Sequence, residues 1–114
     1  MASTLFPTVT RNFRKVAGDT FCIAVKITGL SSTVSEAYMS CKKNKSDDTY
    51  VFQKTWGNGI TVDSDGIYRF KASPSDTNVA EGRYYYDCQI RYGSDVETVV
   101  MGTVDFVWSP TDED

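Results

Sequence analysis

Apolar and polar residues alternate along most of the chain with a period of two, which predicts β-strands. In residues 20–28, Phe21, Ile23, Val25 and Ile27 fall on one face, and smaller or polar residues fall on the other. Further alternating runs occupy residues 9–15, 36–43, 50–55, 60–62, 67–72, 82–92 and 97–108. Together they give about eight short strands with turn signals roughly every ten residues, which is typical of an antiparallel sandwich or barrel.

Glycine, proline and acidic residues mark the turns between these runs. Residues 63–66 end in Asp-Gly, a strong hairpin signal, and residues 93–95 predict a second hairpin. Residues 73–78 form a polar turn, and residues 76–81 are compatible with a single helical turn. Gly102 lies inside the last run, where it predicts a β-bulge or a close crossing of another strand.

The 114 residues fit one domain with its own hydrophobic core. We expect an N-terminal arm over residues 1–8, a β-sandwich over residues 9–108 and an acidic C-terminal tail over residues 109–114. No apolar run is long enough to cross a membrane, and no signal-peptide core follows Met1. The expected place of synthesis is therefore a cytoplasm.

One predicted strand resembles an immunoglobulin strand. The direction in which its cysteine points decides whether the immunoglobulin disulfide can form. Tyr86-Asp87-Cys88 matches the Tyr-x-Cys ending, with Cys22 upstream as a possible partner. Alternation turns Cys22 outward and Cys88 inward, so the two thiols cannot meet across a core. The predicted fold is therefore all-β, a single antiparallel β-sandwich of about seven or eight strands with immunoglobulin-like topology but without the inter-sheet disulfide. We expect Cys41, like the other two cysteines, to be reduced.

Candidate chemistry is sparse. The sequence contains no histidine, which removes Ser-His-Asp and Cys-His catalysis and most zinc sites. Residues 63–66 place glycine fourth, whereas a calcium-binding EF-hand loop needs it sixth. The net charge of −3 disfavours binding to nucleic acid. We therefore expect no enzymatic activity, no catalytic or metal-binding residue, no cofactor, and neither a nucleic acid nor a membrane as a partner.

Tyr85, Asp87, Gln89 and Arg91 share one face of the strand over residues 82–92. They form either a polar contact surface for a partner or the solvent face of a half-buried strand, with Asp87 held by cross-strand neighbours. We favour the second interpretation, because antiparallel sheets commonly leave one face to water.

Trp56 and Asn58 belong to a glycine-rich loop over residues 56–59. The tryptophan either stacks on a sugar or a protein partner, or folds back over the end of the sandwich. The sequence favours neither alternative, so both residues are candidate contacts to a partner or a glycan.

Five motifs follow one another between residues 16 and 108. They are Gly-Asp-Thr-Phe at 18–21, Asp-Gly-Ile-Tyr-Arg-Phe at 65–70, Ser-Pro-Ser-Asp-Thr at 73–77, Gly-Arg-Tyr-Tyr-Tyr-Asp at 82–87 and Thr-Val-Val-Met-Gly-Thr-Val at 98–104. In this order the chain resembles a family of bacteriophage virion β-sandwich modules, similar to the N-terminal domain of upper-baseplate and tail-fibre-associated proteins. It departs from the family at Cys88, where an aliphatic residue is usual, and no receptor-binding or fibre-forming region follows residue 108.

The resemblance implies a non-enzymatic structural protein of a bacteriophage virion. Its expected role is an adaptor or attachment module of the tail, baseplate or fibre region, which assembles with other virion proteins or with further copies of itself. It would be made in the cytoplasm of the host bacterium and end in the virion. The alternatives are a capsid (head) decoration or head-fibre protein, and a carbohydrate-binding adhesive β-sandwich that uses Trp56, Asn58 and surface tyrosines.

Overall fold

The computed structural model describes residues 8–27, 30 and 33–108. In this part of the chain the elements are β1 (Val9–Thr10), β2 (Phe13–Val16), β3 (Phe21–Lys26), β4 (Val34–Lys42), β5 (Phe52–Trp56), β6 (Gly59–Val62), β7 (Ile67–Ala72), α1 (Pro74–Thr77), β8 (Gly82–Tyr92) and β9 (Asp95–Val107). The prediction of an all-β fold is confirmed. No helix in the described ranges is long and apolar enough to cross a membrane.

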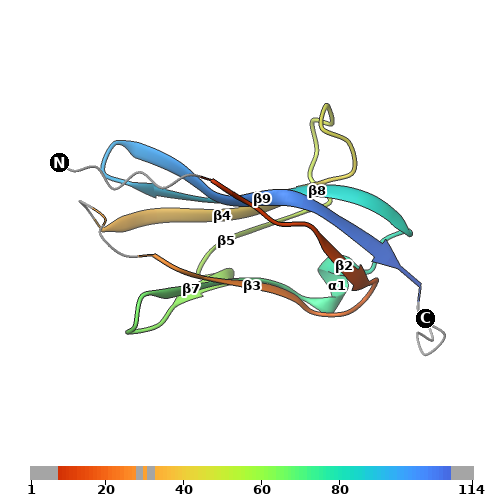
Figure 1. Ribbon diagram of the computed structural model, residues 1–114, viewed down its shortest axis with the longest axis horizontal. Coiled ribbons are helices and arrows are strands. Elements are labelled where there is room, and N and C mark those ends of the chain that lie inside the picture. Colours follow the sequence, from red (N-terminus) through yellow and green to blue (C-terminus); the bar gives the residue numbers. More distant parts are fainter. Residues whose placement is uncertain (1–7, 28–29, 31–32, 109–114) are drawn as a thin grey trace.

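The strands form two packed layers, as Figure 1 shows. They are hydrogen-bonded in the order β1-β9-β8-β4-β5-β6-β7-β3, and β2 also pairs with β9. One layer contains β9, β8 and β4, and the other contains β7 and β3. The short β5–β6 pairing joins the layers along one side, so that the sheet curls back on itself. The predicted immunoglobulin-like sandwich is confirmed.

The first strand differs from its prediction in two respects. Residues 9–15 were expected to be one strand with antiparallel neighbours, but β1 and β2 are separate and both run parallel to β9. The break falls at Arg11, whose carbonyl oxygen lies only 2.0 Å from where a Cβ on Gly102 would stand. The close crossing predicted at Gly102 is therefore the one with the break in the first strand. Because this break divides one predicted strand into β1 and β2, the structure has more strands than the seven or eight predicted.

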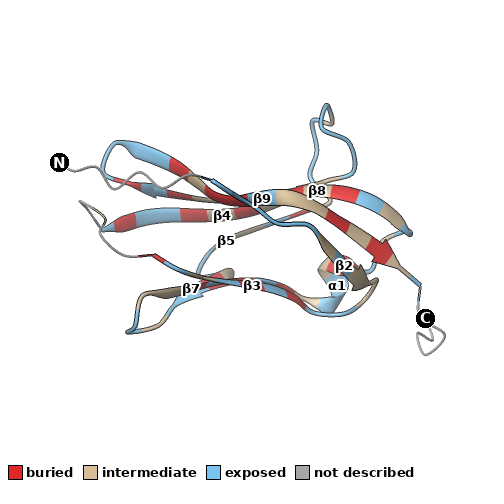
Figure 2. Ribbon diagram, in the orientation of Figure 1, coloured by how far each residue is buried: buried red, intermediate tan, exposed pale blue. Residues whose placement is uncertain are grey.

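The core lies between the two layers and is made by the inward faces of the strands, which Figure 2 shows as alternating buried and exposed segments. Its fully buried large side chains include Phe21, Met39, Ile60, Phe70, Ile90, Tyr92, Val104 and Phe106. The faces predicted from alternation in residues 20–28 and 67–72 point inward where the structure describes them. Each large apolar side chain contributes about 1.5–3 kcal/mol when fully buried, so these faces hold the layers together.

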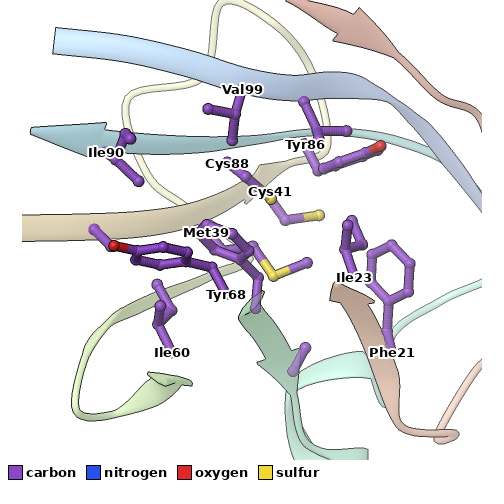
Figure 3. Close-up of a cluster of buried hydrophobic side chains, with 14 of the residues drawn as sticks. Phe21, Ile23, Met39, Cys41, Ile60, Tyr68, Tyr86, Cys88, Ile90 and Val99 are labelled. Carbon is purple, nitrogen blue, oxygen red and sulfur yellow. The ribbon is translucent and has the colours of Figure 1, made fainter. Parts of the chain in front are cut away.

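All three cysteines are free, as predicted. Cys22 is exposed, whereas Cys41 and Cys88 are buried in the apolar cluster drawn in Figure 3. Burial raises the pKa of Cys41 to about 12 and raises the pKa of Cys88 far above its ordinary value. Both thiols therefore stay protonated and pack as small apolar side chains.

The corner before β8 depends on local polar contacts. The helical turn α1 begins at Pro74, earlier than the predicted 76–81, because the Asp76 carboxylate accepts hydrogen bonds from the Ser73 amide (2.8 Å) and hydroxyl (2.9 Å). The Tyr84 hydroxyl then donates to the Ala80 carbonyl at 2.8 Å. This bond resembles the tyrosine corner of immunoglobulin-like sandwiches, and it fixes the entry of the chain into β8.

Both predicted hairpins form. Gly66 closes the first with a φ of 80°, and its amide donates to the Asp63 carbonyl at 3.1 Å. Gly93 begins the second with a φ of 59°, which joins β8 to β9. The predicted arm 1–8, apart from Thr8, and the predicted tail 109–114 lie outside the described residues.

Candidate functional site

The outward face of β8 carries the four polar side chains singled out in the sequence. The inward residues of this strand are buried in the core, so Tyr85, Asp87, Gln89 and Arg91 are left on the opposite side, as predicted. Tyr85, Asp87 and Gln89 are only partly exposed, although they point away from the core. Neighbouring side chains on the outer side of the sheet therefore shield them partly from solvent.

Strand register places outward residues of β4 and β9 beside them. The resulting rows across β4, β8 and β9 are Tyr38, Gln89 and Thr98; Ser40, Asp87 and Met101; and Lys42, Tyr85 and Thr103. The central row puts the Asp87 carboxylate between a hydroxyl and a thioether. The face is thus a mixture of aromatic, amide, hydroxyl and charged groups.

The residues of these rows other than Thr98 form the floor of a hollow of about 830 Å³, which we call the outer groove. Its lining residues are Thr10, Asn12, Tyr38, Ser40, Lys42, Lys45, Tyr50, Gln53, Arg83, Tyr85, Tyr86, Asp87, Gln89, Arg91, Met101, Gly102 and Thr103. The connection between β4 and β5 rises from the outer layer in Figure 1 and carries Lys45 and Tyr50. Thr10 and Asn12, at the break between β1 and β2, line the other side.

Cationic side chains of the groove lie over tyrosine rings. Lys42 Nζ is 5.2 Å from the Tyr50 ring centre, Lys45 Nζ is 5.1 Å from that of Tyr85, and the Arg91 guanidinium is 5.4 Å from that of Tyr38. Such contacts are worth roughly 0.5–1 kcal/mol at exposed sites. They hold long, flexible side chains at the groove wall and leave their charges accessible.

The two ends of the face are neutralised within the chain. Arg91 lies 3.5 Å from Glu36, which also accepts a hydrogen bond of 3.1 Å from the Tyr38 hydroxyl. At the opposite end, Arg83 makes a two-pronged contact with Asp105 at 2.8 and 3.1 Å. Among the charged groups that line the groove, Asp87, Lys42 and Lys45 have no ion-pair partner in the described part of the chain.

Asp87 lies on the groove floor without a partner. None of the hydrogen bonds or ion pairs between described residues involves its carboxylate, although a cross-strand partner was expected. Lys42 instead donates to the Asp47 carbonyl at 2.7 Å. Burial raises the pKa of Asp87, and the charge of Lys42 lowers it only in part. The groove floor thus carries a poorly solvated carboxylate that a cation or a hydrogen-bond donor would stabilise.

Trp56 and Asn58 lie elsewhere. Trp56 ends β5 with 41% of its surface exposed, and its ring centre is 5.9 Å from that of Tyr68 in the other layer. The Asn58 amide donates to the Thr55 carbonyl at 2.8 Å within the tight turn. Neither residue lines the outer groove, so the structure brings together only the β8 residues of the predicted set.

Sequence reasoning missed the contributions of β4 and β9 to the groove. Ala37, Met39 and Cys41 alternate along the predicted run 36–43 and are buried, so the residues between them face outward. Which of them stand beside Asp87 depends on the register between strands, and the sequence contains no signal for it.

The groove is lined by side chains that can bind a partner. Across residues 8–27, 30 and 33–108, there is no cluster of three or more histidine, cysteine, aspartate or glutamate side chains suited to a metal ion. The side chains that line it supply ionic, hydrogen-bonding and aromatic contacts. Their arrangement suits recognition of a partner.

No protein-family model and no curated protein matches the sequence. Among solved structures, a predicted glycoside hydrolase from Bacteroides vulgatus ATCC 8482 matches with a TM-score of 0.55 and 15% identity. That match covers 89% of this chain but only 17% of the other protein. The extracellular domain of the voltage-gated sodium channel beta4 subunit matches with a TM-score of 0.52 and 13% identity, over 95% of this chain and 99% of that domain. The matches show the class of fold, an immunoglobulin-like β-sandwich.

Proposed function

We propose that the chain is a non-enzymatic attachment module that binds another protein through its outer groove. The observation that carries this proposal is the unpartnered, half-buried Asp87 on the floor of a concave sheet face bordered by tyrosines and cations. Aromatic and arginine side chains are enriched at protein interfaces, where they supply large contact areas and directional bonds.

The breadth of the groove supports a protein partner rather than a small ligand. Its lining residues come from five strands, from the break between β1 and β2 and from the β4–β5 connection, and it opens on the outside of the sandwich. Exposed apolar groups, Tyr50 and Met101, stand among its polar residues. The sodium channel beta4 domain has the same class of fold and forms parallel homodimers with a role in cell–cell adhesion, which is a precedent for attachment by such a domain.

We propose a bacteriophage virion as the setting, in the tail, baseplate or fibre region, with head decoration as the alternative. This part of the proposal rests on the order of the five sequence motifs. In the structure the motifs lead into β3, β7 and β8, form α1 and run along β9. The motifs in β8 and β9 thus belong to strands that line the groove.

We do not extend the proposal to carbohydrate binding. That hypothesis combined Trp56 and Asn58 with the tyrosines of the sheet face. The structure separates these two residues from the tyrosines, because the Trp56 ring packs against Tyr68 of the other layer and neither Trp56 nor Asn58 lines the groove.

Site-specific photo-crosslinking tests the proposed function. A photoreactive phenylalanine analogue at Gln89 probes the groove, and the same analogue at Lys71, exposed on β7, is the matched control. In particles of the source phage, we expect Gln89 to give a crosslinked product with a protein and Lys71 to give none. Crosslinks from Lys71 without any from Gln89 would contradict the proposal, and absence of the chain from purified particles would contradict the virion setting.

A further inference from the structure

Resting on the proposed function, we propose that the partner in the outer groove is a second copy of this chain. The two copies would meet face to face around a two-fold axis, with Lys45 of one copy paired with Asp87 of the other. In such an interface every contact occurs twice, so one surface must carry both members of each pair.

A cation from an occupant of the groove would stabilise the Asp87 carboxylate on the groove floor. Asp87 is half-buried on the outer face, and none of the hydrogen bonds or ion pairs between described residues involves its carboxylate. The nearby charge of Lys42 offsets only part of the effect of burial on its pKa. A poorly solvated charge without a partner is costly, and a cation delivered by an occupant removes that cost. Neither cross-strand neighbour, Ser40 or Met101, can supply it.

The chain carries a suitable cation on a projecting segment. Lys45 lies in the connection between β4 and β5, which stands out from the outer layer in Figure 1. Its side chain is exposed, rests over Tyr85 at 5.1 Å and belongs to none of the ion pairs in the described part of the chain. A segment that rises above the sheet is placed to reach into the groove of a facing molecule.

The contacts of the other charged residues in the groove favour a pairing of Lys45 with Asp87. Arg91 pairs with Glu36 and Arg83 with Asp105, whereas the Lys42 ammonium donates a hydrogen bond to the Asp47 carbonyl and keeps its charge. Lys42 is half-buried and held by this bond, but Lys45 is exposed on the projecting connection. Asp87 and Lys45 are thus the complementary charges of the groove that two facing copies can bring together.

Apolar groups on the same face favour a self-association of this kind. Tyr50 and Met101 are 48% and 47% exposed, and both line the groove. Burying them against a second copy adds hydrophobic contact to the ion pairs.

A charge-swap series measured by sedimentation velocity tests the inference. The wild-type chain is expected to dimerise, and Lys45→Glu and Asp87→Lys are each expected to weaken the dimer by about tenfold or more. The double variant K45E/D87K restores the pair in both halves of a two-fold dimer, so it is expected to recover most of the lost affinity. Lys71→Glu, on the other layer, is the control and should leave the dimer unchanged.

The outcomes separate this inference from the proposed function. A wild-type chain that stays monomeric at every concentration overturns the second-copy inference, even where Gln89 still crosslinks to a different protein. A dimer that tolerates K45E overturns the pairing, and K45E alone suffices for this because Lys45 is exposed on the connection between β4 and β5. Asp87→Asn, which keeps the shape of the side chain, replaces D87K if the larger residue prevents folding.

Discussion

Three consecutive tyrosines in β8 serve different purposes because neighbouring residues of a strand face opposite sides of the sheet. The hydroxyl of Tyr84 bonds to the Ala80 carbonyl at the corner, and that of Tyr86 bonds to the Arg11 carbonyl at the break between β1 and β2, both at 2.8 Å. Tyr85, between them, lines the outer groove. Two of the tyrosines therefore stabilise the sandwich, while the third is available for contact with a partner.

Tyr84→Phe removes the corner hydrogen bond and little else. We expect it to lower the free energy of unfolding by about 1 kcal/mol, because the Ala80 carbonyl loses its donor. Tyr85→Phe is the matched control and should change stability by less than about 0.5 kcal/mol. Urea unfolding of both variants measures the difference, and equal effects would contradict the corner's role.

Thiol labelling checks the facing directions of the cysteines. At mildly alkaline pH, Cys22 should react with a thiol reagent in the folded protein, since it is exposed. Cys41, with a pKa raised to about 12 by burial, and Cys88 should react only after unfolding. Rapid labelling of all three cysteines in the native protein would contradict the described core.

At the scale of elements, the last strand shows how an irregularity positions a surface. The β8–β9 register shifts between Cys88 and Gln89, so that Val99 and Val100 are both buried. After this bulge, Met101 and Thr103 face outward beside Asp87 and Tyr85. The bulge thus decides which β9 residues line the groove.

Gly102→Ala tests the close crossing of β9 by the break in the first strand. The added Cβ would meet the Arg11 carbonyl oxygen, so β1 and β2 must move away from β9. We expect a loss of about 1–3 kcal/mol in unfolding free energy. Hydrogen exchange should also accelerate at the Arg11 amide, which bonds to the Met101 carbonyl. Val96→Ala, at an exposed site on the same strand, should leave both quantities nearly unchanged.

The helical turn α1 makes stability depend on pH. Burial raises the pKa of Asp76, but hydrogen bonds from Ser73 and the contact with Lys54 at 3.0 Å outweigh it, so the net pKa lies below its usual value. A carboxyl group with a lowered folded pKa stabilises the protein above its unfolded pKa, and this contribution is lost as pH falls through the folded pKa.

Asp76→Asn should therefore be less stable than wild type at neutral pH, by about 1–3 kcal/mol. The difference should shrink as the pH falls below about 4. Thermal unfolding across this range measures it, with Asp65→Asn on an exposed turn as the control. A difference that stays constant with pH would show that the charge of Asp76 does not contribute.

At the scale of the whole molecule, the sequence predicts what depends on local alternation and turn chemistry. Inward and outward faces, the free cysteines and the hairpins at 63–66 and 93–95 all follow from residues near one another in the chain. The immunoglobulin-like arrangement follows from the number of strands and their turns.

The groove itself depends on contacts that local patterns do not specify. The rows beside Asp87 require the register of β4 and β9 against β8, and the groove wall requires β1 and β2 to run parallel to β9. No residue type marks these choices, since they result from how the two layers pack. Trp56 is also placed by a long-range contact: its glycine-rich loop suggested a binding residue as one alternative, and its ring packs against Tyr68 in the other layer.

Methionine oxidation measures most directly whether the outer groove is the attachment face. Met101 is exposed on this face, whereas Met39 is fully buried in the core and serves as an internal control. We predict that peroxide oxidises Met101 readily in the isolated, dilute chain and slowly in the native assembly, while Met39 stays protected in both. Equal oxidation of Met101 in the free and assembled states would contradict the account.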